Sequence, residues 1–440
     1  MKIVLINKSD ARGGAAVVTF RLMEGLRSLG IDARMLVAEK LTDSPYVTQA
    51  ASPLRIKSSF MAERLRIFAE TGFDRSILFK ADTGYCGLDL SRHPMVREAD
   101  AIFLNWVNQG FLSLDDIDGI CALGRPVIWT MHDMWCLTGI CHHAGDCRRY
   151  RGRCGDCPLL GQARTPFTKI FGSPAGADDI SARTHRRKAA LYGSQSITFV
   201  AVSRWLGRLA KESSLLSSQD VRVIGNAFPV EETPTRRPFN PGQLDLIFGA
   251  ARLDDPVKGF ELLIESFRSL KERHPDIAAR TRLTTFGDIR QPELLDRIPI
   301  DSRHLGRVST DAIPGIYAAA DVVLSTSYYE TLPGTLVEGQ AYGCIPVAFD
   351  SGGQRDIVDH LSTGYIATPY DTAEIADGIA WAYRTLRVED THIIGRMRQS
   401  VITKFSSQNI ARRYLELLAE KNDLNQTHFP VERGQSDTLI

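Results

Sequence analysis

The sequence predicts an α/β protein of two domains, each built on a parallel β-sheet with helices on both faces. Three observations indicate this fold. The chain has 440 residues, which is enough for two domains of ordinary size with a core each. Short apolar runs alternate with amphipathic segments in both halves, as in βαβ units. Between the halves, residues 226–241 contain four prolines, and we interpret this stretch as the inter-domain linker.

The first domain, residues 1–228, is expected to begin with a buried strand over 2–6, a glycine turn and a helix over 15–29. Further strands are expected at 33–37, 100–105, 126–131, 196–202 and 221–224, and further helices at 58–68 and 205–212, the last capped by Ser203. Residues 71–90 have no clear period, and residues 157–189 are interpreted as an irregular basic stretch.

The second domain, residues 229–405, repeats the alternation of strands and helices. Its expected strands are 244–250, 283–286, 304–308, 322–324, 345–349 and 364–367, and its expected helices are 259–272, 313–320, 335–342 and 372–386. A final helix is predicted at 406–421. The polar tail, 422–440, is predicted to be disordered.

The composition is that of an ordinary globular protein and excludes some partners. Charged residues make up 24% and hydrophobic residues 43%, with a net charge of +1, so nucleic acid is not an expected partner. The N-terminus, MKIVLINKSD, predicts a first strand and not a secretory signal, and no run approaches the length of a membrane span. We expect a cytoplasmic protein. A membrane-anchored substrate would give it peripheral contact with the inner face of the membrane.

The stretch 321–356 carries the strongest functional signal. It predicts a strand, a loop, a helix closed by Gly343 and a second strand. Glu330 lies before the helix and Glu338 inside it, while the amides of residues 332–336, Pro333 excepted, offer donors to an anion. A nucleotide-sugar has hydroxyls at both ends and phosphate in the middle, so it would suit this arrangement. The alternative is that both glutamates are solvated surface residues.

Glu330-x7-Glu338 with Pro333-Gly334 between, followed by Pro346-Val347, closely resembles the donor-binding segment of retaining glycosyltransferases of the family 4 class. The resemblance implies the GT-B fold: two Rossmann-like domains that face a crevice, with the final helix crossing back to the first domain. It implies transfer of a sugar from a UDP- or GDP-sugar donor with retention of configuration.

The resemblance also implies roles for single residues. Glu338 would bind the ribose hydroxyls and Glu330 the donor-sugar hydroxyls, with Arg252 and Lys258 as a clamp on the diphosphate. The clamp loop has one more intervening residue than the family pattern. The remaining donor-binding positions are Gly306 to Val308 at the base and Leu332, Pro333, Gly334 and Thr335 at the helix start. No Asp-x-Asp motif is placed to hold a metal on the diphosphate, so we expect catalysis without a metal cofactor.

Two features of the first domain point to the same crevice. Gly13-Gly14 is either a tight strand-to-helix turn or a point where the backbone approaches a phosphate or sugar, and the family resemblance favours the second. His132 follows a predicted parallel strand, and residues 129–135 resemble the family stretch whose His contacts the donor sugar. The alternative is a hydrogen-bonded structural histidine. Asp133 is interpreted as a loop or cap residue.

Asn105-Trp106, the run 132–135 and a cysteine cluster resemble a narrower subgroup, the colanic-acid-type exopolysaccharide glycosyltransferases. This implies a glycan or lipid-diphosphate-linked acceptor in surface-polysaccharide biosynthesis. Two positions depart from the subgroup, because Asn105 stands where it usually has His and Cys136 where it usually has Pro. The basic residues of the irregular stretch are either solvated or partners of a lipid diphosphate: Arg183, Arg186, Arg187 and Lys188.

The cysteine-rich loop, residues 136–160, predicts a structural zinc site. Four thiols at Cys141, Cys147, Cys154 and Cys157 can close a tetrahedral site. Free thiols and a disulfide pair are the alternatives, and His142 or His143 could replace one cysteine as a ligand.

Two other functions are considered. A GT-B phosphorylase or epimerase is one, but no lysine site for a phosphorylase's pyridoxal cofactor is identified. A zinc-stabilised, non-catalytic binding protein is the other, and the neutral charge balance argues against a nucleic-acid-binding form of it.

Overall fold

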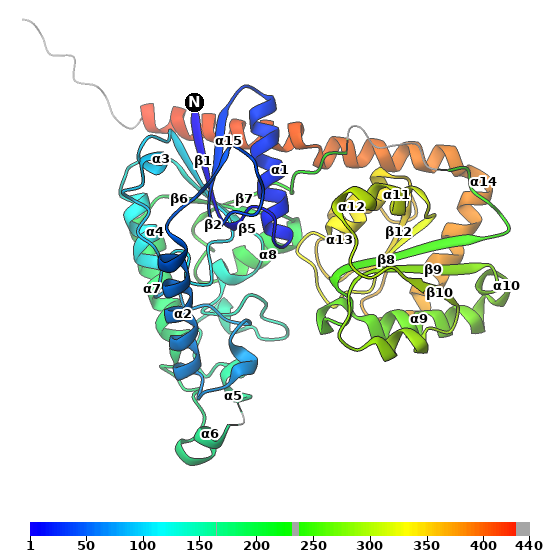
Figure 1. The fold of residues 1–440 in the computed structure, drawn as a ribbon, viewed down its shortest axis with the longest axis horizontal. Coiled ribbons are helices and arrows are strands. Elements are labelled where there is room, and N and C mark those ends of the chain that lie inside the picture. The colour runs from blue at the N-terminus through cyan, green and yellow to red at the C-terminus, as the bar shows by residue number, and fades with distance from the viewer. Residues whose placement is uncertain (164, 231–236, 428–440) are drawn as a thin grey trace, which may run out of the picture.

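The computed structural model describes residues 1–163, 165–230 and 237–427. These residues form two α/β domains that lie side by side (Figure 1). The first contains a seven-stranded sheet of order β3-β2-β1-β4-β5-β6-β7, and the second a six-stranded sheet of order β10-β9-β8-β11-β12-β13. Every strand pair is parallel. The predicted fold class is therefore confirmed.

The strands of the first sheet are β1 (Lys2–Ser9), β2 (Asp32–Glu39), β3 (Val47–Gln49), β4 (Ala101–Leu104), β5 (Val127–Met131), β6 (Ile197–Ala201) and β7 (Asp220–Val223). Those of the second are β8 (Leu244–Arg252), β9 (Thr281–Asp288), β10 (Asp301–His304), β11 (Val322–Ser325), β12 (Ile345–Phe349) and β13 (Tyr365–Ala367). Central strands such as β4, β5 and β12 are buried along their whole length, because helices cover both faces of a parallel sheet.

The helices of the first domain are α1 (Gly14–Ser28), α2 (Pro53–Glu70), α3 (Pro94–Arg97), α4 (Leu114–Cys121), α5 (Pro158–Gly161), α6 (Pro166–Phe171), α7 (Ile180–Ser194) and α8 (Arg204–Glu212). Those that follow are α9 (Phe260–Arg273), α10 (Pro275–Ala278), α11 (Ile313–Ala318), α12 (Gly334–Ala341), α13 (Gln354–Ile357), α14 (Thr372–Phe405) and α15 (Ser407–Thr427). No helix among the described residues combines the length and the apolar character needed to cross a membrane.

The C-terminal helix α15 returns to the first domain, as expected (Figure 1). The hydroxyl groups of Tyr414 on α15 and Thr130 on β5 are hydrogen-bonded at 2.8 Å in a buried setting. The start of α15 crosses α1 at Gly25, where an added Cβ would lie 2.5 Å from the carbonyl oxygen of Ser407. Only glycine allows this close approach of the two helices.

Several predicted boundaries were wrong. Helix α14 does not end at 386 but continues to Phe405, and α15 continues to Thr427, so residues 422–427 are helical and not disordered; residues 428–440 lie outside the described part. The strand expected at 304–308 ends at His304. The backbone of Gly306 has φ +67°, which is not a strand conformation.

In both sheets, the strand order reverses beside the first strand of the domain, at β1–β4 and at β8–β11. Loops that leave the carboxyl ends of such neighbouring strands run in opposite directions, and this is where open α/β sheets bind ligands. The loops after these four strands carry Gly13-Gly14, Asn105, Lys258 and Glu330. Sheet topology therefore places the predicted site residues at the switch points.

Candidate active site

The loops after β8 and β11 are held against each other by backbone contacts. The amide of Tyr328 donates to the carbonyl of Val257 at 2.8 Å, and the Thr326 hydroxyl donates to the carbonyl of Gly259 at 3.0 Å. Gly259 has φ +64°, and a Cβ there would lie 2.1 Å from the Thr326 oxygen. Glycine is therefore required after Lys258, and it fixes the lysine beside the second loop.

Lys258 and Glu330 form an ion pair between these loops. The Lys258 Nζ lies 2.5 Å from Glu330 Oε1, and the Ser327 hydroxyl donates to the same oxygen at 3.0 Å. Burial alone would lower the pKa of Lys258, but the charge of Glu330 and its hydrogen bond raise it. Lys258 is therefore a fixed cation at neutral pH. The structure brings together two residues that the sequence analysis chose separately.

The segment Ser351-Gly352-Gly353 after β12 holds the backbone of Glu330. The amide of Gly353 donates to the Glu330 carbonyl at 2.9 Å. A Cβ on Gly352 would lie 2.0 Å from the same oxygen, and the Ser351 hydroxyl donates to the carbonyl of Ser327 at 2.7 Å. The carboxylate is thus positioned from both sides of its loop.

Arg252 does not join the Lys258–Glu330 pair. It ends β8 after a register shift between Gly249 and Arg252. Its guanidinium lies 3.4 Å from Asp254 and 3.3 Å from Asp255, both in its own loop. The two carboxylates hold Arg252 at the edge of the site. Of the two predicted clamp cations, Lys258 is the one that forms an ion pair with Glu330.

Helix α12 begins at Gly334 without a capping side chain, so its first amides are not satisfied by a cap. Glu338, one turn inside, accepts a hydrogen bond from the Arg21 guanidinium at 2.8 Å. Arg21 belongs to α1 of the first domain and also packs over the Phe228 ring, 5.1 Å from its centroid. The predicted ribose-binding carboxylate therefore faces the first domain, and the sequence analysis missed its partner.

The other predicted donor-binding positions lie after β10 and at the start of α12. Gly306 follows β10, and its carbonyl accepts from the amide of Gly287 at the end of β9 at 2.8 Å. Val308 is partly buried against the core, and Leu332 is buried.

Helix α1, like α12, begins without a side chain that caps its first amides. Gly13 has φ +91° and precedes the helix without a side-chain cap. A Cβ on Gly13 or Gly14 would meet no atom within 4 Å. The positive φ requires glycine at position 13, whereas no packing contact within the protein explains the second glycine. Space is open beside the first amides of α1.

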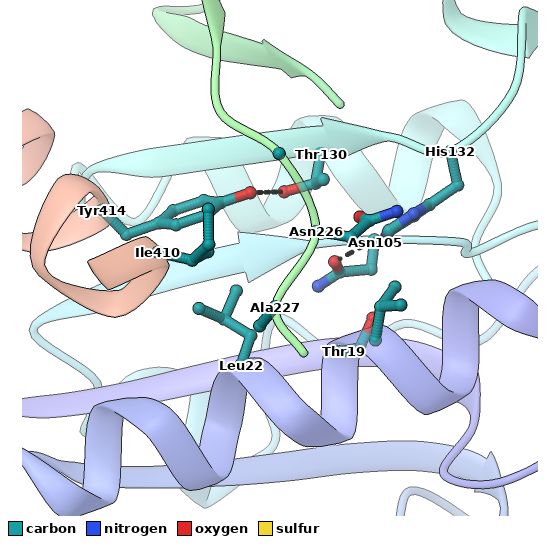
Figure 2. A pocket seen from close by; sticks show the side chains of 11 residues that line it. Thr19, Leu22, Asn105, Thr130, His132, Asn226, Ala227, Ile410 and Tyr414 are labelled. Carbon is teal, nitrogen blue, oxygen red and sulfur yellow. Dashed lines mark hydrogen bonds between the residues drawn. The ribbon is translucent and has the colours of Figure 1, made fainter. Parts of the chain in front are cut away.

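His132 follows β5 and points into a small cavity that is lined on one side by α1, and its ring lies near Asn105 and Asn226 (Figure 2). Its Nε2 donates to the Asn105 side-chain oxygen at 3.1 Å. Burial lowers the pKa of His132 to about 4, so the ring is neutral at pH 7. Its carbonyl oxygen accepts from the Thr331 hydroxyl at 3.0 Å. The backbone carbonyl of His132 thus contacts the loop of the second domain that carries Glu330.

Asp133 caps the turn that follows, accepting from the amide of Trp135 at 2.8 Å. Its second partner, not predicted from the sequence, is His142, whose Nδ1 lies 2.7 Å from Asp133 and whose Nε2 lies 2.8 Å from Asp82. Burial alone would lower the pKa of His142, but the two carboxylates raise it to about 10. His142 is therefore an imidazolium with both nitrogens engaged, and the suggestion that it could replace a cysteine as a metal ligand was wrong.

The next residue, His143, connects the cysteine-rich loop to the second domain. Its ring lies 4.4 Å from that of Tyr329, centroid to centroid. Tyr329 immediately precedes Glu330. No sequence signal joined these segments, because almost two hundred residues separate them.

The basic stretch is not irregular, because α7 begins at Ile180 after Asp179, which caps it. Its arginines are paired with carboxylates: Arg183 with Glu70, Arg186 with Asp178 and Arg187 with Asp115. Lys188 is completely buried. Arg186 is exposed and Arg183 and Arg187 are partly exposed, each beside a carboxylate, so the three arginines form a paired, partly solvated helix face and not an unpaired basic patch.

The four clustered cysteines are all free thiols and line one cavity. Burial raises the pKa of the Cys141 thiol to about 12, and the charges of the other three act in the same direction. Within the ranges that the structure describes, no group of three or more His, Cys, Asp or Glu side chains already has the geometry of a metal site.

Comparison with known proteins points to one class. Residues 235–389, which include Lys258, Glu330 and Glu338, match the family model of glycosyl transferases group 1. The whole chain has the fold of solved GT-B glycosyltransferases. One is the Anabaena protein Alr3699/HepE in complex with UDP and glucose, with 18% identity, a TM-score of 0.58 and coverage of 95% of this chain and 99% of that one. Another is the lipopolysaccharide outer core galactosyltransferase WaaB, apo form, with 14% identity, a TM-score of 0.58 and coverage of 96% and 100%.

Similar curated proteins match over about a third of the chain. An uncharacterized glycosyltransferase of Methanocaldococcus jannaschii, MJ1607, is 30% identical over 166 residues, which are 35% of this chain and 40% of that protein. The N-acetyl-alpha-D-glucosaminyl L-malate synthase of Bacillus anthracis is 27% identical over 165 residues, 34% of this chain and 42% of that protein. The chain thus spans about two fifths of the length of these relatives.

Proposed function

We propose that this protein is a retaining glycosyltransferase that moves a sugar from a nucleotide-sugar to a glycan or lipid-diphosphate-linked acceptor in exopolysaccharide or surface-polysaccharide biosynthesis. The observation that carries the proposal is the Lys258–Glu330 pair at the β8–β11 switch point, 2.5 Å apart, beside the uncapped start of α12. A cation and free helix amides suit a diphosphate, and a carboxylate suits sugar hydroxyls. The match to group 1 glycosyl transferases supports the same function.

The chemistry needs charge stabilisation on the leaving group. The bond between the sugar anomeric carbon and the phosphate oxygen breaks, and the acceptor oxygen forms a new bond to that carbon on the same face. The acceptor proton passes to the departing phosphate oxygen. Lys258 and the amides of α12 stabilise the negative charge that develops on the diphosphate, and a preorganised cation is effective because it needs no reorganisation during the reaction.

Glu330 and Lys258 divide the donor between them. A diphosphate would share the Lys258 cation, which leaves a Glu330 oxygen for the sugar hydroxyls. Glu338 would accept from the ribose hydroxyls in the same way while it keeps one oxygen on Arg21. Because Arg21 lies on α1, a bound nucleotide would contact residues that both domains position. The open space at Gly13-Gly14 is where α1 would approach the ligand.

The donor is a UDP- or GDP-sugar, and UDP-sugars are the first to test because the Anabaena protein of the same fold was solved with UDP-glucose. No metal is required for this scheme, since Lys258 supplies the positive charge. The experiment that tests the function is a thermal-shift panel of UDP- and GDP-sugars with wild-type protein and Lys258→Ala.

We expect peripheral membrane contact through an apolar tip at α6, defined by Phe73, Phe167, Ile170 and Phe171. The tip lies at the end of the first domain far from α9 (Figure 1). Three of its rings form one T-shaped and one tilted pair, with centroid distances of 4.9 and 4.6 Å. Even so, Ile170 is 75% exposed and Phe171 71% exposed. Clustered exposed apolar side chains mark interaction surfaces, and a lipid-linked acceptor would lie at a membrane.

The double variant Ile170→Glu/Phe171→Glu is therefore expected to lose most of the sedimentation with phosphatidylglycerol–phosphatidylethanolamine vesicles that the wild type shows. Val388→Glu is the matched control, because Val388 is an 83% exposed apolar residue on α14. Equal sedimentation of the double variant and the control would contradict membrane contact at α6.

A further inference from the structure

Lys188 is a buried cation without an acidic partner. Its side chain is fully buried, and its Nζ donates to the carbonyls of Trp135 at 2.5 Å and Thr138 at 3.0 Å and lies 3.5 Å from the Trp135 ring centroid. In the described part of the chain, no carboxylate forms an ion pair with it. Carbonyl dipoles and an aromatic face compensate only in part for the cost of removing a charge from water. A negative charge nearby would complete the compensation.

The four thiols of the cysteine-rich loop lie next to this cation. Cys141, Cys147, Cys154 and Cys157 line one cavity, and Thr138 is part of the same wall. The Thr138 carbonyl accepts from Lys188, so the ammonium group contacts one residue of that wall, and its charge interacts with Cys141 and Cys154.

We propose that these four cysteines bind one structural zinc ion as thiolates. Four thiolates around a divalent ion carry a net negative charge, which Lys188 would balance. Zinc prefers such tetrahedral sulfur sites, and four protein ligands leave no open position for catalysis. In the described residues the four side chains line one cavity without already forming a group that could hold a metal ion, so zinc binding would require them to turn toward its centre. The four cysteine sulfurs are the soft ligands that zinc accepts, and the ammonium group of Lys188 supplies the positive charge.

The zinc ion would hold the cysteine-rich loop in place next to Glu330. The loop has little regular structure between Thr138 and Cys157, with a 3₁₀ turn at 149–151, and its backbone has positive φ at Gly145, Gly155 and Asp156. A few buried side chains, such as Ile140, Tyr150 and Leu160, already anchor the loop, and a metal ion would tie its cysteines together as well. Cys141 is followed directly by His142, held between two carboxylates, and by His143, which packs on Tyr329 beside Glu330. Zinc would therefore fix the loop against the donor-side residues.

The test begins with wild-type protein purified without chelator or metal-affinity resin. Elemental analysis is expected to give about one zinc per chain, and X-ray absorption is expected to show a shell of sulfur at about 2.3 Å. Cys154→Ser should lose the metal. Cys86→Ser should keep it, because Cys86 is a free thiol outside the cavity. A metal-free wild type, or one whose mass shows a disulfide among these four cysteines, would overturn the proposal whether or not Cys154→Ser folds.

Lys188→Met provides a second measurement. Without the counter-charge, zinc affinity is expected to fall about 10- to 100-fold, as for other outer partners of metal ligands, and transfer of zinc to a competing chelator should become faster. Lys169→Met is the control, since Lys169 lies on α6. Unchanged zinc affinity in a folded Lys188→Met protein would contradict the charge-balance part of the inference. Metal content is measured without donor or acceptor, so failure of the glycosyltransferase proposal would not affect these results.

Discussion

Lys258→Ala is expected to lower the rate of sugar transfer by about 100-fold or more while the protein stays folded. Removal of one preorganised electrostatic contact to a developing charge costs about this much. Lys258 is a cation held by Glu330 at 2.5 Å and fixed by the loop contacts of Gly259. Glu330→Ala should cause a loss of similar size, because the lysine then lacks its positioning partner and the sugar lacks its acceptor group.

The measurement is nucleoside diphosphate release, with a melting curve for each variant. Lys271→Ala is the matched control, because Lys271 lies in the last turn of α9, outside the site, and it should retain full activity. Lys258→Arg keeps the charge and should retain more activity than Lys258→Ala. Near-wild-type turnover in a well-folded Lys258→Ala protein would remove this residue from the mechanism.

His142→Ala is expected to lower the free energy of unfolding by about 3–5 kcal/mol, the usual cost of removing one partner from a buried ion pair. His142 bridges Asp133 and Asp82 at 2.7 and 2.8 Å. Arg64 remains beside Asp82 in the variant, whereas Asp133 keeps only neutral donors such as the indole of Trp106. Urea unfolding of the wild type and the variant measures the difference.

The pH dependence of this difference has a definite sign. The pKa of His142 is raised in the folded protein to about 10, above the value of about 6.5 for an unfolded chain. Its contribution is therefore fully present below about pH 6.5 and is lost as the pH rises toward 10. The pKa of Asp133 is lowered, so its contribution is present above about pH 4 and is lost in acid. The difference between wild type and variant should be largest between these limits.

An exposed histidine provides the control, because His392 lies on the surface of α14. His392→Ala should change the free energy of unfolding by less than about 0.5 kcal/mol. A His142 difference that grows toward pH 10, or that stays under about 1 kcal/mol at pH 6, would contradict the charged assignment.

Local patterns made much of the fold predictable. The apolar runs that became β4, β5 and β12 were long enough to be recognised, and Gly343 ends its helix with φ +90° as expected. Where strands were short or helices long, the patterns failed: β10 has four residues, and α14 continues for 34 residues through Gly378 and Gly395 without a proline to end it. Helix α7 was not predicted because its buried face includes His185 and Lys188 in place of apolar residues.

The site was predictable only where its parts are close in sequence. Glu330, Glu338 and the start of α12 lie within one motif, and Lys258 follows a recognisable loop. The Arg21–Glu338 contact spans 317 positions, and the pairing of His142 with Asp82 spans 60. Such contacts depend on how the sheets and loops pack, which residue spacing does not encode. His142 could be found only once the structure showed two carboxylates on one ring.

The central claim, that Lys258, Glu330 and Glu338 bind a nucleotide-sugar, is tested most directly by a thermal-shift panel of UDP- and GDP-sugars. Each is added in excess to wild-type protein, in a buffer freed of Mg²⁺ and Mn²⁺ by EDTA at a level that leaves the zinc content unchanged. At a concentration 100 times its dissociation constant, a bound ligand raises the free energy of unfolding by about 2.7 kcal/mol. We predict that one nucleotide-sugar of the panel raises the melting temperature of the wild type and of Lys271→Ala but not of Lys258→Ala. No shift with any nucleotide-sugar, or an equal shift in Lys258→Ala, would contradict the claim.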